Sequence, residues 1–210
     1  MVKQETHLEN LAEIRSLMER SSRFLSLSGL SGVFAGGVAL AGALAVYLYL
    51  DGEVEVPIYD SLAGMIRYER DIIVTLMAIA AGVLLLALMG AAYFTNRRAK
   101  RNNLPIWNAT IRRFIIHLMI PLITGGIFCL ALLLHGFTGL VVPSVLIFYG
   151  LSLISAGKFT HSDIHYLGLT EILLGIISIA FMKYGLLFWT LGFGVMHIVY
   201  GLVMYIKYKD

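Results

Sequence analysis

The sequence predicts an all-α, polytopic membrane protein with six transmembrane helices, and its composition is the first indication. Hydrophobic residues make up 59% of the 210 residues and charged residues only 14%. Soluble domains usually have about 45–50% and about 25%, respectively. The second indication is that the apolar residues form long unbroken stretches, and the third is that the basic residues gather in alternate loops. This composition excludes an ordinary soluble domain and a disordered chain.

Residues 1–23 predict a cytoplasmic amphipathic helix ahead of the first span. Thr6 and Glu9 have the spacing of a capping box. Apolar residues then recur at helical spacing, at Leu8, Leu11, Ile14, Leu17 and Met18. The segment carries four basic and four acidic residues, whereas lipid-binding helices usually have a basic polar face. We therefore expect this helix to pack on cytoplasmic loops of the chain or on a partner, with a position among the lipid headgroups as the alternative.

Six apolar stretches are long enough to cross the hydrocarbon layer, which takes about 20 residues in a helix. They are apolar on all sides and do not alternate as the strands of a membrane barrel would. Of the 16 basic and 13 acidic residues, only Glu171 lies inside them. A single transmembrane domain over residues 24–210 is expected, with spans at residues 24–50, 72–94, 114–135, 138–157, 164–182 and 185–206.

The basic residues orient these spans. Thirteen of them fall on one side of the expected membrane and three on the other, where Arg67, Arg70 and Lys183 lie. Because cytoplasmic loops are enriched in lysine and arginine, we expect both termini in the cytoplasm. The net charge of +3 is then a topology signal, and we expect the lipid bilayer and no nucleic acid as a partner.

Polar residues of five spans lie at similar depths in the cytoplasmic half. A rise of about 1.5 Å per residue places them roughly 5–13 Å inside the boundary. A charged carboxylate in hydrocarbon costs about 2.5–3.5 kcal/mol, so Glu171 should face the bundle interior and be protonated or paired with His197 or His117. The expected intramembrane polar cluster comprises Glu171, His117, His197, Tyr200, Ser28, Ser31 and Ser152.

Pro121 adds a backbone feature at the same depth. Proline has no amide hydrogen, so the carbonyl of His117 loses its helical partner and the third span should kink there. The freed carbonyl then needs another donor or a water molecule. Two interpretations of the polar cluster stay open: a network that only fixes helix packing, and a site for a proton, an ion or a small ligand.

Small residues are concentrated in the first span, where Gly32 and Gly36 form a GxxxG pair. Small residues four positions apart let two helices approach closely. We expect this face to pack inside the chain. A homo-oligomer or a larger membrane complex is the alternative.

Evidence for a metal or cofactor is weak. His161 and His165 have the i,i+4 spacing of a ligand pair, but Ser162 or Asp163 is expected to cap the fifth span, which would leave His161 outside the helix. His117 and His197 are a remote candidate pair of axial ligands for a b-type haem. No phosphate-binding loop or catalytic motif occurs. We therefore predict no cofactor, and the lack of a catalytic motif favours a non-enzymatic protein over an enzyme.

Two segments, MERSSRFLSLSGLSGVFAG (Met18–Gly36) and GFGVMHIVYG (Gly192–Gly201), resemble signature segments of an uncharacterised family of bacterial six-helix inner-membrane proteins. The resemblance implies a bacterial cytoplasmic membrane and brings no activity with it. The layout of six spans is also similar to the small acid-resistance membrane protein family, without residues that carry over.

Two functions are therefore expected. The first is a non-enzymatic accessory or structural subunit, or a bundle that binds a small ligand. The second is a small transporter or channel with a proton- or ion-linked site at Glu171, His117 and His197.

Overall fold

A computed structural model describes residues 28–52, 70–102 and 107–208. This part of the chain is helical and contains no strand. It confirms the all-α prediction. It also contains six helices that are long enough and apolar enough to cross a membrane. The amphipathic helix expected at residues 1–23 lies outside the described residues. The first five of the six are α2 (Gly29–Tyr49), α3 (Arg70–Arg101), α4 (Ala109–Leu134), η1 with α5 (Thr138–Leu140 and Val141–Gly157) and α6 (Ser162–Ala180).

The sixth span, Met182–Tyr208, is built from four short pieces. A π-helix interrupts it, and His197 is the first residue after this π-helix. The pieces are η2 (Met182–Tyr184), α7 (Gly185–Trp189), the π-helix η3 (Thr190–Met196) and α8 (His197–Tyr208).

Two helices extend beyond the stretches that hydropathy marks. Helix α3 continues past Phe94 to Arg101, because arginine and lysine are good helix formers even though they end an apolar window. Helix α4 begins at Ala109, where the side chain of Asn108 accepts a hydrogen bond from the amide of Ile111 at 2.8 Å. Both helices therefore project beyond the apolar stretches that were expected to span.

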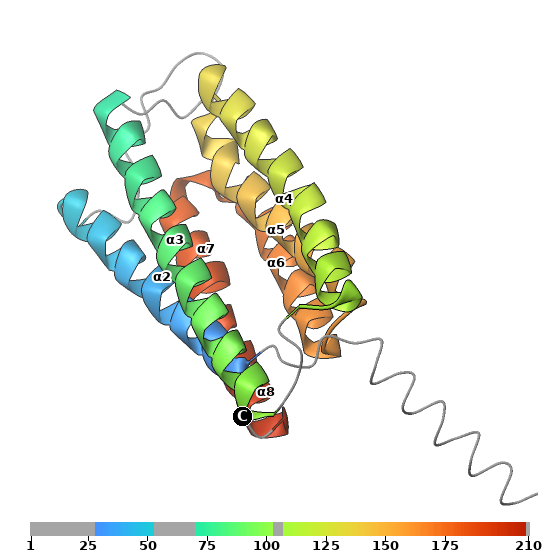
Figure 1. Cartoon of the computed structure of the whole chain (residues 1–210). Helices are drawn as coiled ribbons and strands as arrows, with labels where there is room; N and C mark the ends of the chain where they lie inside the picture. Colours follow the sequence, from blue (N-terminus) through green and yellow to red (C-terminus); the bar gives the residue numbers. More distant parts are fainter. Residues whose placement is uncertain (1–27, 53–69, 103–106, 209–210) are drawn as a thin grey trace, which may run out of the picture.

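The helices form two groups of three, which lie side by side in Figure 1. Helix α2 lies between α3 and the sixth span in one group, and α5 lies between α4 and α6 in the other. The groups meet where the sixth span packs against α5 and α6. The sixth span is thus central, with α2 on one side and the second group on the other.

Glycines bring α2 and the sixth span into backbone contact. A methyl group at Gly29 would collide with the amide of Tyr205, and one at Gly201 would lie 2.5 Å from the amide of Val33. Gly32 faces Gly201, and Gly36 faces the carbonyl of Gly194. We call the contact of these five glycines the glycine seam (Gly29, Gly32, Gly36, Gly194 and Gly201). The face of small residues on the first span therefore packs inside the chain, as close helix approach requires.

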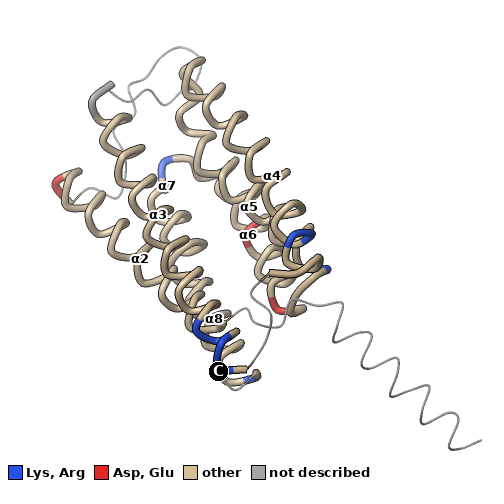
Figure 2. Tube along the Cα trace, in the orientation of Figure 1, with Lys and Arg blue, Asp and Glu red and all other residues tan. Residues whose placement is uncertain are grey.

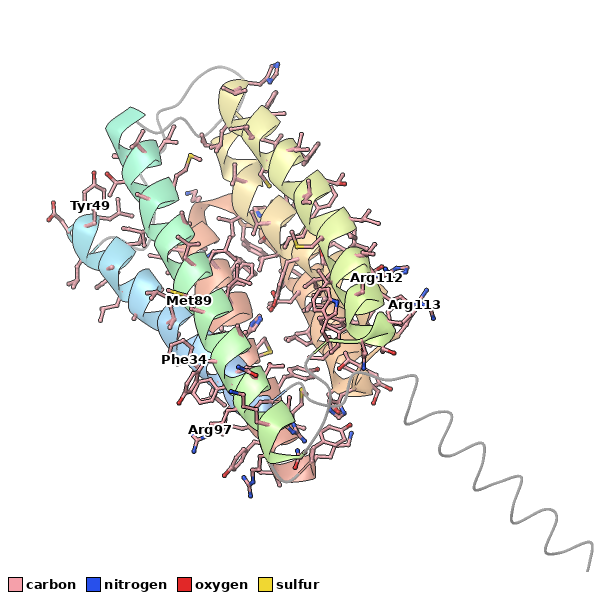
Figure 3. The ribbon with its side chains drawn as sticks, viewed as in Figure 1. Phe34, Tyr49, Met89, Arg97, Arg112 and Arg113 are labelled. Atoms are coloured by element: carbon pink, nitrogen blue, oxygen red, sulfur yellow. The ribbon has the colours of Figure 1, made fainter. Side chains whose placement is uncertain are left out.

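Helices α3 and α4 lie at the outside of their groups. Helix α3 packs mainly against α2, where Phe34 lies over Gly90 and contacts the ring of Phe94 at a centroid distance of 5.7 Å. Its other apolar side chains are largely exposed, among them Met89, which is labelled on α3 in Figure 3. Helix α4 continues through Pro121 without interruption, and the kink stays a prediction.

Candidate functional site

Glu171 lies in the middle of α6, as the tenth of its 19 residues. Its side chain is completely buried and faces the sixth span. A methyl group at Gly192 would lie 2.5 Å from Oε2 of Glu171. The lack of a side chain at Gly192 is therefore what leaves room for this carboxylate in the interior.

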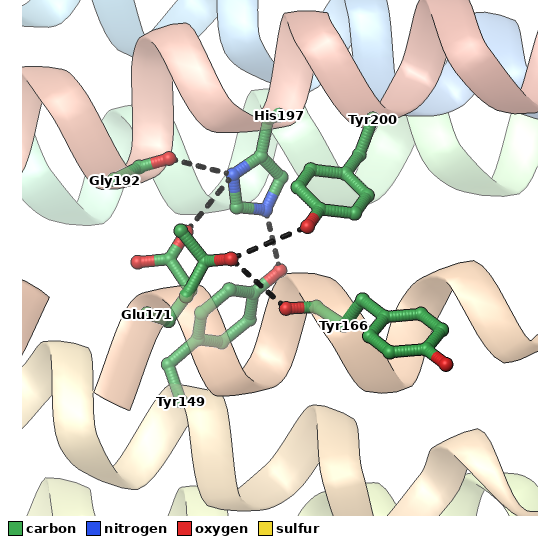
Figure 4. A network of polar contacts seen from close by, with 7 residues as sticks. Tyr149, Tyr166, Glu171, Gly192, His197 and Tyr200 are labelled. Carbon is green, nitrogen blue, oxygen red and sulfur yellow. Dashed lines mark hydrogen bonds and ion pairs between the residues drawn. The ribbon is translucent and has the colours of Figure 1, made fainter. Parts of the chain in front are cut away.

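His197 lies opposite Glu171 and makes three polar contacts, which Figure 4 shows. Its Nδ1 is 3.0 Å from the carbonyl oxygen of Gly192 and 3.5 Å from Oε1 of Glu171. Its Nε2 is 2.7 Å from the hydroxyl of Tyr149 on α5. Since a carbonyl oxygen can only accept, Nδ1 carries the proton and donates it to Gly192. In the neutral ring, Nε2 then accepts a hydrogen bond from Tyr149.

The π-helix explains how His197 reaches Gly192. In an α-helix the carbonyl of residue i lies under residue i+4, whereas in a π-helix it lies under residue i+5. The π-helix that covers residues 190–196 thus places the carbonyl of Gly192 under His197, five positions later. Single π turns are frequent at functional sites. Nothing in the sequence apart from the pair of glycines at Gly192 and Gly194 signals this local structure.

Neither carboxylate oxygen of Glu171 has a hydrogen-bond partner among the described residues. The N–H of His197 lies within reach of two acceptors, the Gly192 carbonyl and Glu171 Oε1, and it bonds to the carbonyl. A small shift of either side chain would turn this N–H toward Glu171. Because an ionised carboxylate needs such a donor, whereas a protonated one carries its own O–H donor, the arrangement can accommodate gain and loss of a proton.

Aromatic rings surround the pair on one side. The ring of Tyr149 stacks on His197 at a centroid distance of 5.4 Å and contacts Phe193 at 5.1 Å. Trp189 extends the row, 5.8 Å from Phe193. Rings of this size keep the surroundings apolar, which strengthens electrostatic contacts within the site.

Tyr200 lies beside this pair, whereas the serines form hydrogen bonds within their own helices. The hydroxyl of Tyr200 is 3.3 Å from that of Thr170, next to Glu171 in the chain. Ser152 is fully buried and donates to the carbonyl of Phe148 at 2.8 Å. Ser31 donates to the carbonyl of Ser28 at the start of α2. Of the polar cluster expected from sequence, the structure thus gathers Glu171, His197 and Tyr200.

His117 does not join the cluster, contrary to the expectation from its depth. It is exposed on α4, 3.3 Å from the hydroxyl of Ser155 and 4.8 Å, ring to ring, from Phe159. Helix α4 packs against α5 and lies away from the sixth span. Equal depth therefore places two residues at one level without placing them on facing helices. Tyr149, which the sequence analysis did not select, takes the position beside His197.

His161 lies outside α6 and His165 lies within it, as expected, but the residue that caps the helix differs from the expected one. His161, rather than Ser162 or Asp163, is the N-cap residue. Its ring lies tilted against that of Tyr208, with the ring centroids 3.9 Å apart, while His165 lies a turn later on α6. No group of three or more histidine, cysteine, aspartate or glutamate side chains suited to a metal is found within the described ranges. Both ring nitrogens of His197 have protein partners, so binding a haem iron would require breaking one of these contacts.

Comparison of the chain with protein-family models, with curated proteins and with solved structures found no match. The family resemblance of Met18–Gly36 and Gly192–Gly201 therefore stays a prediction. What the fold and the site establish is a helical protein whose six apolar helices are long enough to cross a membrane, with a buried glutamate–histidine pair where its two groups of helices meet.

Proposed function

We propose that this chain is a small, non-enzymatic membrane protein that binds and releases a proton at Glu171 and His197, and that it couples this step to the passage of a solute or ion. The observation that carries the proposal is the burial of Glu171 at mid-helix, with no hydrogen-bond partner in the described part of the chain and with His197 3.5 Å away. Ionisable residues inside membrane spans are costly, and they commonly mark ion pathways and proton relays.

A proton fits this pair better than a metal cation does. Calcium takes six to eight oxygen ligands, and magnesium demands an octahedral set. The oxygen atoms close to His197 Nδ1 are Oε1 of Glu171 and the carbonyl oxygen of Gly192. Nδ1 already donates a hydrogen bond to this carbonyl. An N–H pointing into the site repels a metal ion but can exchange a proton with a carboxylate.

The alternative role of accessory subunit has less support. It relied on two surfaces for a partner, the small residues of the first span and the amphipathic helix expected at residues 1–23, which lies outside the described residues. Gly29, Gly32 and Gly36 pack against the sixth span, so this face is occupied within the chain.

We further propose a bacterial cytoplasmic membrane with both chain ends in the cytoplasm. The proposal is supported by the basic residues, most of which gather at one end of the bundle in Figure 2. Arg97, Arg112 and Arg113 point outward at this end in Figure 3, whereas Lys183 lies in η2, at the other end of the sixth span from Lys207. We call the end with Arg97 and Lys207 the basic end. In a Cys129→Ser background, Lys158→Cys should react with an impermeant thiol reagent added on the cytoplasmic side, and Lys183→Cys should react with the reagent added on the other side.

Proton binding can be measured without knowing the solute. Infrared difference spectra of the purified protein between acidic and basic pH should contain a carbonyl band from a protonated carboxylic acid. In Glu171→Gln this band should disappear, because the amide keeps the shape of the side chain but does not titrate. Asp51→Asn, which removes an exposed carboxylate at the end of α2, is the matched control and should keep the band.

The transport step is then tested in liposomes with a pH-sensitive dye inside. A membrane potential should drive proton entry through wild-type protein and through Asp51→Asn, and at least tenfold less through Glu171→Gln. Identical titration bands in wild-type and Glu171→Gln protein would exclude the proton site. A titrating Glu171 with equal proton entry in all three would favour the accessory role.

A further inference from the structure

One face of α6 carries a regular series of buried residues that leads from the basic end to the site. Asp163, Leu167 and Glu171 follow one another at intervals of four, and all three are buried. Residues four apart lie one above the other on a helix. Asp163 in the first turn is therefore separated from Glu171 by about 12 Å along the axis, with Leu167 between them.

Apolar side chains fill the space on this path. Leu167 forms a buried cluster with Leu153 of α5, Ile164 of α6 and Met204 of α8. Tyr149 and Tyr200 of the site pack against this cluster, and so does Tyr208 near the basic end. We call these four residues the apolar plug (Leu153, Ile164, Leu167 and Met204). They lie between the Glu171–His197 pair and the basic end.

Charged and polar groups close the path beyond the plug. Lys207 donates to both carboxylate oxygens of Asp163, at 3.0 and 3.1 Å, and the hydroxyl of Tyr208 donates to Oδ2 at 2.7 Å. We call these three residues the latch (Asp163, Lys207 and Tyr208). Arg98 of α3 donates to the carbonyl of Tyr208 at 3.2 Å. The latch thus ties the start of α6 to the ends of α8 and α3.

The latch is suited to opening. The Lys207 side chain is 51% exposed and that of Asp163 is 11% exposed, so water is available to replace their contact. The plug beneath it consists of side chains that can change rotamer without moving the backbone. The glycine seam on the opposite side of the sixth span has no such freedom, because backbone touches backbone there.

We infer that the latch and the apolar plug form a gate that controls access to Glu171 and His197 from the basic end. The inference rests on the proposed proton site and adds the route by which that site meets water. When the contact between Asp163 and Lys207 breaks, the end of α8 separates from α6, and water reaches Leu167 and then Glu171.

Thiol labelling tests the gate directly. The chain has one cysteine, Cys129, so the background is Cys129→Ser with Leu153→Cys as reporter in the plug. The protein in lipid nanodiscs is treated with a charged, water-soluble methanethiosulfonate, and the labelling rate is measured. Lys207→Gln should raise this rate at least tenfold. Asp163→Asn, which removes the charge of the other residue of this ion pair, should raise it to the same extent.

Two controls limit the interpretation. Lys158→Gln removes an exposed lysine at the same end of the bundle and should leave the rate of Leu153→Cys unchanged. Ser162→Cys, exposed outside the gate, should label rapidly in every background. A rate within twofold of the intact latch in both Lys207→Gln and Asp163→Asn would overturn the gate.

This measurement needs no transport, so the two proposals fail separately. Labelling that responds to Lys207→Gln without a titrating Glu171 would support the gate as a closure and exclude the proton site. A titrating Glu171 with unresponsive labelling would exclude the gate and leave the proton site in place.

Discussion

The sixth span packs by different means on its two sides. On the side of α2 it meets the glycine seam, where Gly201 and Gly29 bring the two backbones into contact. On the side of α5 and α6 it meets side chains, from Tyr149 and Glu171 at mid-helix to Asp163 at the end. We call this second contact the polar seam. The glycine seam cannot loosen without losing its packing, whereas the polar seam can exchange its bonds for water. Relative movement of the two groups of helices is therefore expected at the polar seam.

The largest effect is expected from filling the glycine seam. Gly201→Val would push a side chain into the amide of Val33 and the carbonyl of Gly29, neither of which can move aside. We expect a loss of at least ~3 kcal/mol, the upper end of the usual cost of over-packing, measured by unfolding in detergent. Gly37→Val, where no other group lies within 4 Å of the added carbon, should be tolerated. Equal stability of the two variants would contradict the close contact.

A smaller effect is expected at the polar seam from His197→Leu. This variant leaves Glu171 without its nearest polar partner, and polar contacts between membrane helices contribute up to roughly 1–2 kcal/mol. The double variant Glu171→Leu with His197→Leu should recover the loss, since an apolar replacement of a buried pair is often neutral or stabilising. If the double variant is as unstable as the single one, the pair does not set the stability of this seam.

Tyr149→Phe tests the contribution of the Tyr149 hydroxyl separately from that of its ring. The stacking on His197 remains, but the hydrogen bond to Nε2 is lost. We expect a destabilisation of about 1 kcal/mol, visible as a lower unfolding temperature. Tyr166→Phe is the control, because Tyr166 is 58% exposed. A loss as large in Tyr166→Phe would mean that the bond between Tyr149 and His197 contributes nothing specific.

The smallest effect is expected from Thr170→Val. Its hydroxyl lies 3.3 Å from that of Tyr200 across the polar seam, and its loss should cost about 0.5 kcal/mol, the low end for a hydrogen bond. Thr124→Val removes a hydroxyl that bonds within α4, to the carbonyl of Ile120, and should cost less. The hydroxyl of Thr170 also donates to the carbonyl of Tyr166 within α6, so the difference between the two variants measures what the bond between helices adds to the one within a helix.

The sequence predicts the spans well, since hydropathy is a local property that requires no knowledge of neighbours. It also predicts that Glu171 faces the interior with a histidine as partner, because a lone carboxylate in hydrocarbon has few alternatives. The choice between His197 and His117 depends on which helices adjoin, and no local signal carries that information. Depth alone placed both histidines at one level.

Two other features escape prediction for different reasons. The π-helix before His197 adds one residue to a turn, and the pair of glycines within it is a weak signal because glycine is common in membrane helices. Asp163 and Lys207 lie at the ends of their spans, where charges are normally explained by topology. Their contact joins residues 44 positions apart, which only the packing of α6 against α8 brings together.

Burial and apolar character run in opposite directions among the spans. Helix α3 has the most apolar window, and none of it is buried, while α6 has the least apolar window and the largest buried share. During synthesis, a segment that is poor in apolar residues and carries Glu171 enters the lipid less readily on its own. Helix α6 should therefore depend on α5, its most extensive neighbour, to be inserted. We therefore expect Glu171, the residue of the candidate site, also to make the insertion of α6 depend on a neighbouring helix.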